Sequence, residues 1–269
     1  MPLAVCATPI GNLEDVTLRV LRELAEAELV LCEDTRRTRV LLQRHAISAR
    51  LLSYHEHNEA ERTAEVLPRL LTGTRIALVS DAGLPGISDP GARIVAAALD
   101  AGVPVTVLPG ASAVETALVA GGFAAERYQF LGYLPKTASG LERLWDELRR
   151  WPWPAVAFES PRRLPETLRS LAEAYPERPV AVCRELTKQF EEVVRGSAQG
   201  VRARFREAPK GEITVVIGPG SGGREPGELA RAAEAVSELV AAGVPRRQAS
   251  DLVSRLTGAS RNTLYRRSL

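Results

Sequence analysis

Short apolar segments alternate with amphipathic segments over the first 120 residues. The apolar segments show no polar alternation, which predicts β-strands covered on both faces, as in a parallel sheet. They lie at 3–7, 29–32, 50–53, 76–79 and 103–108, and the helical patterns that follow them lie at 16–27, 35–45, 59–71, 92–99 and 114–120. Regular alternation of strand and helix predicts a parallel α/β domain with right-handed crossovers over residues 1–120.

The pattern changes after the Gly121-Gly122 pair. Strands are then expected at 128–131, 155–158, 179–183 and 212–217, and helices at 139–150, 161–175 and 199–207. These elements predict a second α/β domain over residues 121–219, near the commonest domain size.

The last part of the chain, residues 220–269, is expected to be a linker and a small helical unit. The run G-P-G-S-G-G-R-E-P-G, which begins at Gly218, is too rich in glycine and proline for a regular element. Helices are expected at 228–242, 245–256 and 261–268, with T-G-A-S between the last two. This spacing is typical of a helix-turn-helix.

The composition is that of a globular protein. Of the 269 residues, 45% are hydrophobic and 25% are charged, and the net charge is +2. Cys6, Cys32 and Cys183 lie inside apolar runs without a C-x-x-C pair, which predicts buried thiols in a reducing compartment. No segment is long enough to span a bilayer and the N-terminus lacks a signal pattern, so we expect a cytoplasmic protein without a membrane partner.

Three loops rich in glycine, proline and small residues follow predicted strands of the first domain. They read T-P-I-G-N (8–12), D-A-G-L-P-G (81–86) and G-A-S-A (110–113). Such loops meet at the carboxyl edge of a parallel sheet, where α/β proteins bind small molecules, and glycine lets the backbone approach a ligand closely. Turn chemistry explains one such loop, but three at one edge favour a site. No G-x-G-x-x-G follows the first strand and no G-x-x-x-x-G-K-[ST] occurs, which disfavours dinucleotide and P-loop sites.

Charged residues follow the second predicted strand in the sequence E-D-T-R-R (33–37). Asp34 or Thr35 fits the N-cap of the next helix. Arg36 and Arg37 are unfavourable near the positive end of that helix unless they meet an anion, and a substrate phosphate is the natural partner.

A second polar cluster, H-E-H-N (55–58), follows the third predicted strand. His55 and His57 would lie on one face and could bind a metal, but the sequence offers no clear third ligand, so we expect no metal. Either histidine could instead act as a general base or bind the substrate. Ordinary turn and cap hydrogen bonds of His57 and Asn58 remain an alternative.

The second domain carries basic residues near its strand boundaries. They are Arg162, Arg163, Arg184, Lys188 and Lys210, in the blocks F-E-S-P-R-R, R-E-L-T-K and P-K-G-E. Surface loops carry charge in any protein, so each block alone is a weak signal. Together they form a basic set suited to a phosphodiester backbone.

These blocks, in this order, resemble the RsmI family of ribosomal RNA small subunit methyltransferases I, within the tetrapyrrole methylase-like superfamily. The resemblance rests on A-T-P-I-G-N-L-E-D-V-T-L-R (7–19), C-E-D-T-R-R-T (32–38), H-E-H-N-E (55–59), S-D-A-G-L-P-G-I-S-D-P-G (80–91), F-E-S-P-R-R (158–163), R-E-L-T-K (184–188) and K-G-E (210–212). It implies a methyltransferase of two α/β domains that binds S-adenosylmethionine in the cleft between them, usually as a homodimer. It also implies methylation of the ribose 2′-hydroxyl of a cytidine in the decoding region of 16S rRNA, with the small ribosomal subunit as partner.

The resemblance further implies which residues contact the cofactor. They are Pro9, Asp81, Gly83, Leu84, Ser112, Ala113, Glu159, Ser160, Arg184, Gly211 and Glu212. The chain departs from the family at Leu84, where threonine is frequent, and at residues 110–112, which read G-A-S where G-P-S or G-P-C is frequent. Backbone contacts would survive both changes, so the departures affect only particular side-chain hydrogen bonds.

The other charged loops are expected to hold the target nucleotide. The candidates for substrate binding and catalysis are Glu33, Asp34, Arg36 and His55. Further RNA contacts are expected from Arg37, His57, Asn58, Arg162, Arg163, Lys188 and Lys210.

Two other functions fit parts of the pattern. A methyltransferase of cobalamin synthesis would share the fold and the cofactor cleft, but it would not need the Arg36-Arg37 pair or a basic tail. A DNA-binding regulator would use the C-terminal helices, with Arg261, Asn262, Arg266 and Arg267 on the second helix of the motif. It would not need charged blocks along the edge of an α/β domain.

Overall fold

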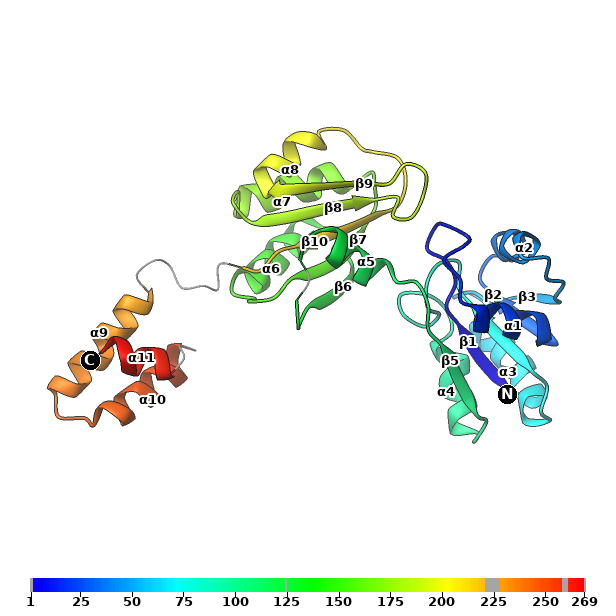
Figure 1. The fold of residues 1–269 in the computed structure, drawn as a ribbon, viewed down its shortest axis with the longest axis horizontal. Helices are drawn as coiled ribbons and strands as arrows, with labels where there is room; N and C mark the ends of the chain where they lie inside the picture. Colours follow the sequence, from blue (N-terminus) through cyan, green and yellow to red (C-terminus); the bar gives the residue numbers. More distant parts are fainter. Residues whose placement is uncertain (1, 124, 221–227, 258–260, 269) are drawn as a thin grey trace.

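The computed structural model describes residues 2–123, 125–220, 228–257 and 261–268. Two five-stranded sheets and a group of helices at the C-terminal end make up this part of the chain (Figure 1). Among the described residues, no helix is both long and apolar enough to cross a membrane. All three cysteines are free and buried, as their apolar surroundings in the sequence predict.

The first sheet is parallel throughout, as predicted. Its strands are β1 (Leu3–Cys6), β2 (Leu29–Cys32), β3 (Leu51–Ser53), β4 (Ile76–Val79) and β5 (Val105–Leu108), and they are arranged in the order β3-β2-β4-β1-β5. Successive side chains of β1 enter different apolar clusters, since Leu3 and Val5 pack with Ile94 whereas Ala4 and Cys6 pack with Leu24. Both faces of the sheet are therefore covered, which explains its unbroken apolar strands.

Five helices connect the strands of the first sheet or follow its last strand. They are α1 (Leu18–Glu26), α2 (Thr35–Arg44), α3 (Glu59–Leu71), α4 (Ala92–Asp100) and α5 (Ala113–Ala120). The last of them, α5, follows β5 in sequence but packs against the second sheet (Figure 1), where Ala117 and Leu118 contact the cluster of Val156, Ala181 and Val216. Because α5 joins the two sheets, it places the loop after β5 between them.

The second sheet is mixed, in the order β6-β7-β10-β8-β9. Its strands are β6 (Gln129–Tyr133), β7 (Ala155–Glu159), β8 (Pro179–Arg184), β9 (Glu192–Ser197) and β10 (Ile213–Ile217), and its helices are α6 (Ala138–Arg149), α7 (Leu164–Ala174) and α8 (Ala198–Arg204). Only β6 and β7 are parallel. The edge strand β9 was absent from the sequence prediction. The boundary predicted at residue 120 between the α/β domains stays a prediction.

Three helices follow in the C-terminal unit, as predicted. They are α9 (Glu228–Ala241), α10 (Arg246–Thr257) and α11 (Arg261–Arg267). Their core contains Val236, Ala249, Val253 and Leu264, so the unit has a small apolar interior of its own. Residues 221–227, most of the predicted linker, and residues 258–260 of the T-G-A-S segment lie outside the described residues.

Candidate functional site

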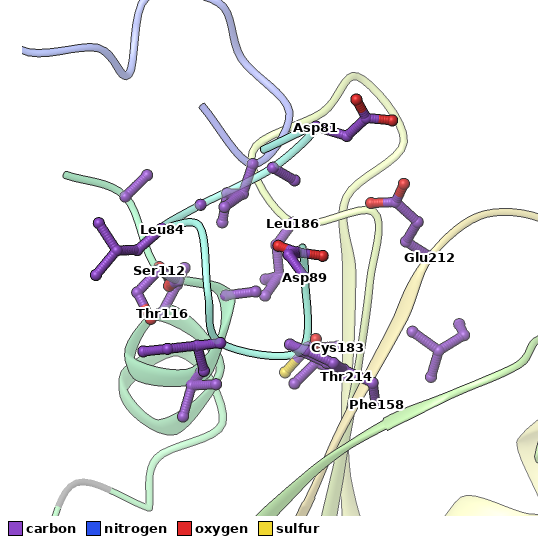
Figure 2. Close-up of a pocket in the computed structure, with 18 of the residues that line it drawn as sticks. Asp81, Leu84, Asp89, Ser112, Thr116, Phe158, Cys183, Leu186, Glu212 and Thr214 are labelled. Atoms are coloured by element: carbon purple, nitrogen blue, oxygen red, sulfur yellow. The ribbon is translucent and has the colours of Figure 1, made fainter. Parts of the chain in front are cut away.

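A cavity of about 1080 Å³ is lined by loops of the first sheet and by strand ends of the second (Figure 2). Its first wall comes from the loops that follow β1, β2, β4 and β5, with Ile10 as the contribution of the first, and its second wall comes from α5 and from residues of β6, β7, β8 and β10. Its volume is at the upper end of the range for small-molecule pockets, roughly 300–1,000 Å³. The three glycine loops predicted to meet at the carboxyl edge, 8–12, 81–86 and 110–113, all contribute to the cavity, and the loop after β2 joins them.

The part of the cavity beside the second sheet is largely apolar. Phe130, Phe158 and Leu186 line it, together with Cys183 at the end of β8. Burial raises the pKa of the Cys183 thiol to about 11, so the group stays protonated at neutral pH. This wall therefore suits the flat or aliphatic part of a ligand.

Three carboxylates line the side of the cavity nearer the first sheet. Glu33 follows β2, whereas Asp81 and Asp89 lie in the loop between β4 and α4. Burial, followed by the negative charges of Glu33 and Asp81, raises the pKa of Asp89 to about 6. Burial and Asp81 also raise the pKa of Glu33. Arg37 is the only basic residue of the described lining, and its Nε atom lies 3.4 Å from Asp81 Oδ2. One cation does not balance three carboxylates, so this side of the cavity favours a positively charged ligand group.

Paired hydrogen bonds join the loop after β1 to the loop after β4. The Thr8 amide donates to the Gly83 carbonyl (2.8 Å), and the Gly83 amide donates to the Thr8 carbonyl (3.1 Å). The Thr8 hydroxyl also donates to the Ser80 carbonyl at 3.1 Å. Gly83 has a φ of +78°, a conformation that favours glycine. The T-P-I-G-N and D-A-G segments thus form one rigid wall.

The Glu159 side chain at the end of β7 is fully buried, and both of its carboxylate oxygens have protein partners. Its Oε1 atom accepts the Ser160 amide (2.6 Å) and lies 2.5 Å from Arg163 Nη2, while Oε2 accepts the Thr167 hydroxyl (2.6 Å). Arg163 Nη1 also donates to the carbonyls of Leu134 and Pro135. Glu159 therefore fixes the shape of this part of the wall.

Most of the predicted cofactor residues line the cavity. These are Asp81, Gly83, Leu84, Ser112, Ala113, Glu159, Ser160, Gly211 and Glu212. Pro9 is buried and does not line the cavity. Arg184 also lies outside the lining, because its guanidinium binds Glu192 Oε2 (3.0 Å) and the Lys210 carbonyl (3.2 Å).

Of the predicted catalytic candidates, the structure brings only Glu33 to the cavity. Asp34 caps α2 by accepting the Arg36 amide (2.8 Å), and its other oxygen lies 2.7 Å from Arg36 Nη2. The hydrogen bonds from Arg36 lower the pKa of Asp34 to about 2. The Arg36 side chain is 85% exposed and lies outside the lining, whereas Arg37, the next residue in the chain, lines the cavity.

His55, His57 and Asn58 form a turn outside the cavity lining. The His55 amide donates to Asn58 Oδ1 (2.8 Å), and the Asn58 side-chain amide donates to the Ser53 carbonyl (3.2 Å). The exposed His57 ring lies 3.3 Å from Glu56. The turn interpretation of this cluster thus accounts for its contacts. In the described part of the chain, no three His, Cys, Asp or Glu side chains gather as a metal-ligating group.

The predicted RNA-binding residues have different surroundings. Lys188 lies 2.8 Å from Glu185 and 3.0 Å from Glu212, and Arg163 is held by Glu159. Arg37, Arg162 and Lys210 have exposed side chains.

Sequence reasoning missed two acidic residues of the cavity. Asp89 lies in the D-P-G segment of the predicted ligand loop after β4. An irregular loop has no periodic pattern from which to tell which of its side chains face inward. Glu115, in the first turn of α5, accepts hydrogen bonds from the hydroxyls of Ser112 and Tyr128. Burial opposes ionisation of Glu115, but these hydrogen bonds outweigh it and lower its pKa. The sequence signal that could have found Asp89 and Glu115 is the position of each a few residues after a glycine-containing loop at a strand end.

Comparison with known proteins covers almost the whole chain. The profile of the Tetrapyrrole (Corrin/Porphyrin) Methylases matches residues 2–201, and that of the RsmI C-terminal HTH domain matches residues 227–269. The ribosomal RNA small subunit methyltransferase I of Mesorhizobium japonicum is 43% identical over 99% of this chain and 91% of its own. The protein of that name from Thermotoga maritima is 44% identical over 80% of this chain and 97% of its own.

Solved structures share the fold. The methyltransferase CobJ superposes with a TM-score of 0.61 and 21% identity over 81% of this chain and 93% of its own. Uroporphyrin-III C-methyl transferase from Thermus thermophilus, complexed with S-adenyl homocysteine, gives a TM-score of 0.56 and 19% identity over 82% of this chain and 98% of its own. These two likenesses support the fold alone, whereas the sequence matches support the family. The chain therefore belongs to the ribosomal RNA small subunit methyltransferase I family, within the tetrapyrrole methylases.

Proposed function

We propose that this chain transfers the methyl group of S-adenosylmethionine to the ribose 2′-hydroxyl of a cytidine in the decoding region of 16S rRNA. The observation that carries the proposal is the cavity with an apolar wall and an acidic wall, in a chain of this family. We further propose that the substrate is the rRNA of the small ribosomal subunit and that the protein works as a cytoplasmic homodimer.

The cavity residues fit S-adenosylmethionine, the cofactor of this methyltransferase family. This cofactor supplies a methyl group bonded to a positively charged sulfonium. Glu33, Asp81 and Asp89 supply negative charge on one side of the cavity, and the apolar wall of Phe130 and Phe158 suits an adenine ring. Gly83 and Gly211 both have positive φ and lack side chains, so their backbones can approach the ligand closely.

The chain itself contributes alignment and exclusion of water. Methyl transfer is an in-line displacement, so most of the rate gain comes from holding the two reactants in register in a shielded cavity. Arg37 lines the cavity and the exposed Arg36 is next to it, at the N-terminus of α2. Two guanidinium groups beside a helix N-terminus suit the phosphates that flank a target nucleotide.

The proposal is tested by mass spectrometry of 16S rRNA from a strain that lacks the protein. We expect one ribose methyl group to disappear from the decoding region and to return when the gene is restored. An unchanged methylation pattern would refute the assignment. Purified enzyme should also methylate small subunits and leave a corrinoid precursor unmodified, which separates the proposal from a methyltransferase of cobalamin synthesis.

Alanine at Arg36 is expected to weaken binding of the small subunit severalfold, because an exposed cation is lost at the N-terminus of α2, next in the chain to Arg37. The slope of log affinity against log salt should fall by about one, as for one phosphate contact. The affinity for S-adenosylmethionine, measured by calorimetry, should hardly change, because Arg36 is outside the cavity lining. Arg22→Ala, which removes an exposed cation from α1, serves as the control. Equal losses of RNA and cofactor binding in the Arg36 variant would contradict this division.

The C-terminal unit is expected to add electrostatic affinity for RNA. Arg261, Arg266 and Arg267 are all exposed on α11. Changing the three to glutamine should weaken binding of the small subunit and reduce the salt slope by about three, with cofactor affinity unchanged. The matched control changes Arg143, Arg149 and Arg150 at α6, which removes the same charge elsewhere. Equal effects of the two triple variants, measured by filter binding, would exclude a specific role of α11.

A further inference from the structure

The loop between β4 and α4 folds back so that both of its aspartates line one cavity. Asp81 begins the loop and Asp89 comes near its end, and both line the cavity (Figure 2). Positive φ angles at Gly83, Gly86 and Ser88 turn the chain within the loop. The Gly91 amide donates to Glu59 Oε1 at 2.8 Å, which ties the end of the loop to α3. The loop thus has an anchored geometry that holds the Asp89 carboxylate at the cavity.

The surroundings of Asp89 are unfavourable for a negative charge. The charged groups that act on it are Glu33 from the end of β2 and Asp81 from its own loop, whose charges raise its pKa, and the nearby Ser80 hydroxyl opposes them only in part. The guanidinium of Arg37 lies against Asp81. A carboxylate that repels two neighbours does not stabilise the fold, and such groups in a cavity are typical of functional sites.

The other acidic residues at or beside the cavity already have protein partners. Glu159 binds Arg163, Ser160 and Thr167. Glu212 pairs with Lys188, and Asp81 accepts the Asp34 amide at 3.0 Å and contacts Arg37. Glu115 accepts two hydroxyl hydrogen bonds. Asp89 and Glu33 are left as the carboxylates best able to take a proton from a bound substrate.

We propose that Asp89 is the general base that accepts the proton of the ribose 2′-hydroxyl, an inference that rests on the function proposed above. As the ribose oxygen forms its bond to the methyl carbon, the bond between that carbon and the sulfur breaks and its electron pair stays on the sulfur, which becomes neutral. The hydroxyl proton passes to the Asp89 carboxylate and then to solvent. Charge and atoms balance without any further reactant.

Asparagine at position 89 tests this role because it keeps the size of the side chain and cannot accept the proton. General-base catalysis contributes about 10²- to 10⁴-fold, so the single-turnover rate of Asp89→Asn at pH 8 should fall by about that factor. Cofactor affinity should fall much less than the rate, because Glu33 and Asp81 keep their charge, and saturating cofactor removes this effect from the single-turnover rate. Asp89→Glu should recover part of the rate. Glu56→Gln, which removes an exposed carboxylate, is the control and should retain the wild-type rate.

The pH profile separates a base from a merely structural residue. The wild-type rate should rise as Asp89 loses its proton near pH 6 and then level off, because only the carboxylate can accept a proton. Glu33→Gln removes one of the repelling charges and should move this rise to lower pH. Asp89→Asn should show no such rise. If the rate of Glu33→Gln no longer increased with pH while the rate of Asp89→Asn still did, the base would be Glu33 and the proposal would be wrong.

Stability measurements show whether the asparagine variant is folded. The pKa of Asp89 is raised from 3.8 to about 6 in the folded chain, so the free energy of unfolding falls as the pH rises through this interval, and the loss is complete above about pH 6. Asp89→Asn should therefore melt above the wild type at pH 8, and the difference should vanish towards about pH 3, where the Asp89 carboxyl is protonated in both the folded and the unfolded chain. If Asp89→Asn is stable and methylates rRNA at the wild-type rate, Asp89 is not the general base, and the proposed function is unaffected. Absence of ribose methylation by the wild type would instead refute the proposed function.

Discussion

Valine in place of Gly83 is expected to lower the affinity for S-adenosylmethionine by about 10- to 100-fold. Gly83 has a φ of +78°, which costs a residue with a side chain about 1–2 kcal/mol and a β-branched residue more. Space is not the obstacle, because an added Cβ atom would lie 3.7 Å from the Ala111 carbonyl oxygen. A strained loop relaxes by giving up its paired hydrogen bonds to Thr8, and cofactor binding must then restore them. Each 1.4 kcal/mol of this cost lowers affinity tenfold, as titration calorimetry would measure.

Gly73→Val is the matched control. Gly73 also has a positive φ, +89°, and nothing lies within 4 Å of an added Cβ atom, but it sits in the turn between α3 and β4, away from the cavity. This variant pays a similar conformational cost in stability and should bind the cofactor normally. If both variants lost affinity to the same extent, general destabilisation would explain the effect and the Gly83 loop would have no special part in the site.

The first sheet was predictable from the sequence because helices cover both of its faces. Every inward or outward position of a strand such as β4 must then be apolar, so four or five apolar residues in a row mark the strand. The convergence of the loops at one edge follows from parallel strands with short connections. The same reasoning fails for β9 in the second sheet. Its residues E-V-V-R-G-S pair on one side only and are partly exposed, so polar side chains are tolerated there.

The packing of α5 could not be inferred from its sequence. The helix reads A-V-E-T-A-L-V-A and is apolar on nearly every face, so no single stripe indicates its partner. The structure shows its buried residues, Ala117 and Leu118, against the second sheet. This contact puts Ser112 and Ala113 at the cavity between the sheets. Tertiary packing, which a local pattern does not encode, thus determines where the third glycine loop lies.

Ion pairs explain why the sequence did not show which basic residues of the second domain are free to bind RNA. Arg163 and Glu159 are four residues apart, but only the fold shows that the carboxylate is fully buried. Lys188 contacts Glu212, which is distant in sequence and reaches it through the pairing of β8 with β10. Because Glu159 is fully buried, leaving it unpaired would be costly, so its ion pair with Arg163 competes with any contact of Arg163 to RNA. Glu212 is 61% exposed, so the pair it forms with Lys188 is a weaker constraint. Arg36 also has an acidic partner, Asp34, but its own side chain is 85% exposed and that of Asp34 is 25% exposed.

Alanine in place of Glu159 is expected to destabilise the protein by about 3 kcal/mol, because removing one partner of a buried ion pair leaves the other uncompensated. The Glu159 side chain is fully buried and satisfies Arg163, Thr167 and the Ser160 amide together. Arg163 keeps its hydrogen bonds to two carbonyls, which places the loss at the lower end for such pairs. Urea unfolding followed by circular dichroism measures the loss. Cofactor affinity should also fall, because Ser160 lines the cavity and loses its anchor.

Two variants separate the burial of Glu159 from its charge. Glu166→Ala breaks an ion pair with Arg169 on the surface of α7, where the side chains are 60% and 45% exposed, and should leave the urea midpoint almost unchanged. Glu159→Gln keeps the shape, and its single carbonyl oxygen can accept the Ser160 amide while its NH2 group donates to the Thr167 hydroxyl oxygen, so its stability should fall between the wild type and the alanine variant. If Glu159→Ala unfolded at the same urea concentration as Glu166→Ala, the buried pair would contribute nothing and Ser160 would need another anchor. If instead glutamine restored stability without restoring cofactor affinity, the charge of Glu159 would act on the ligand directly.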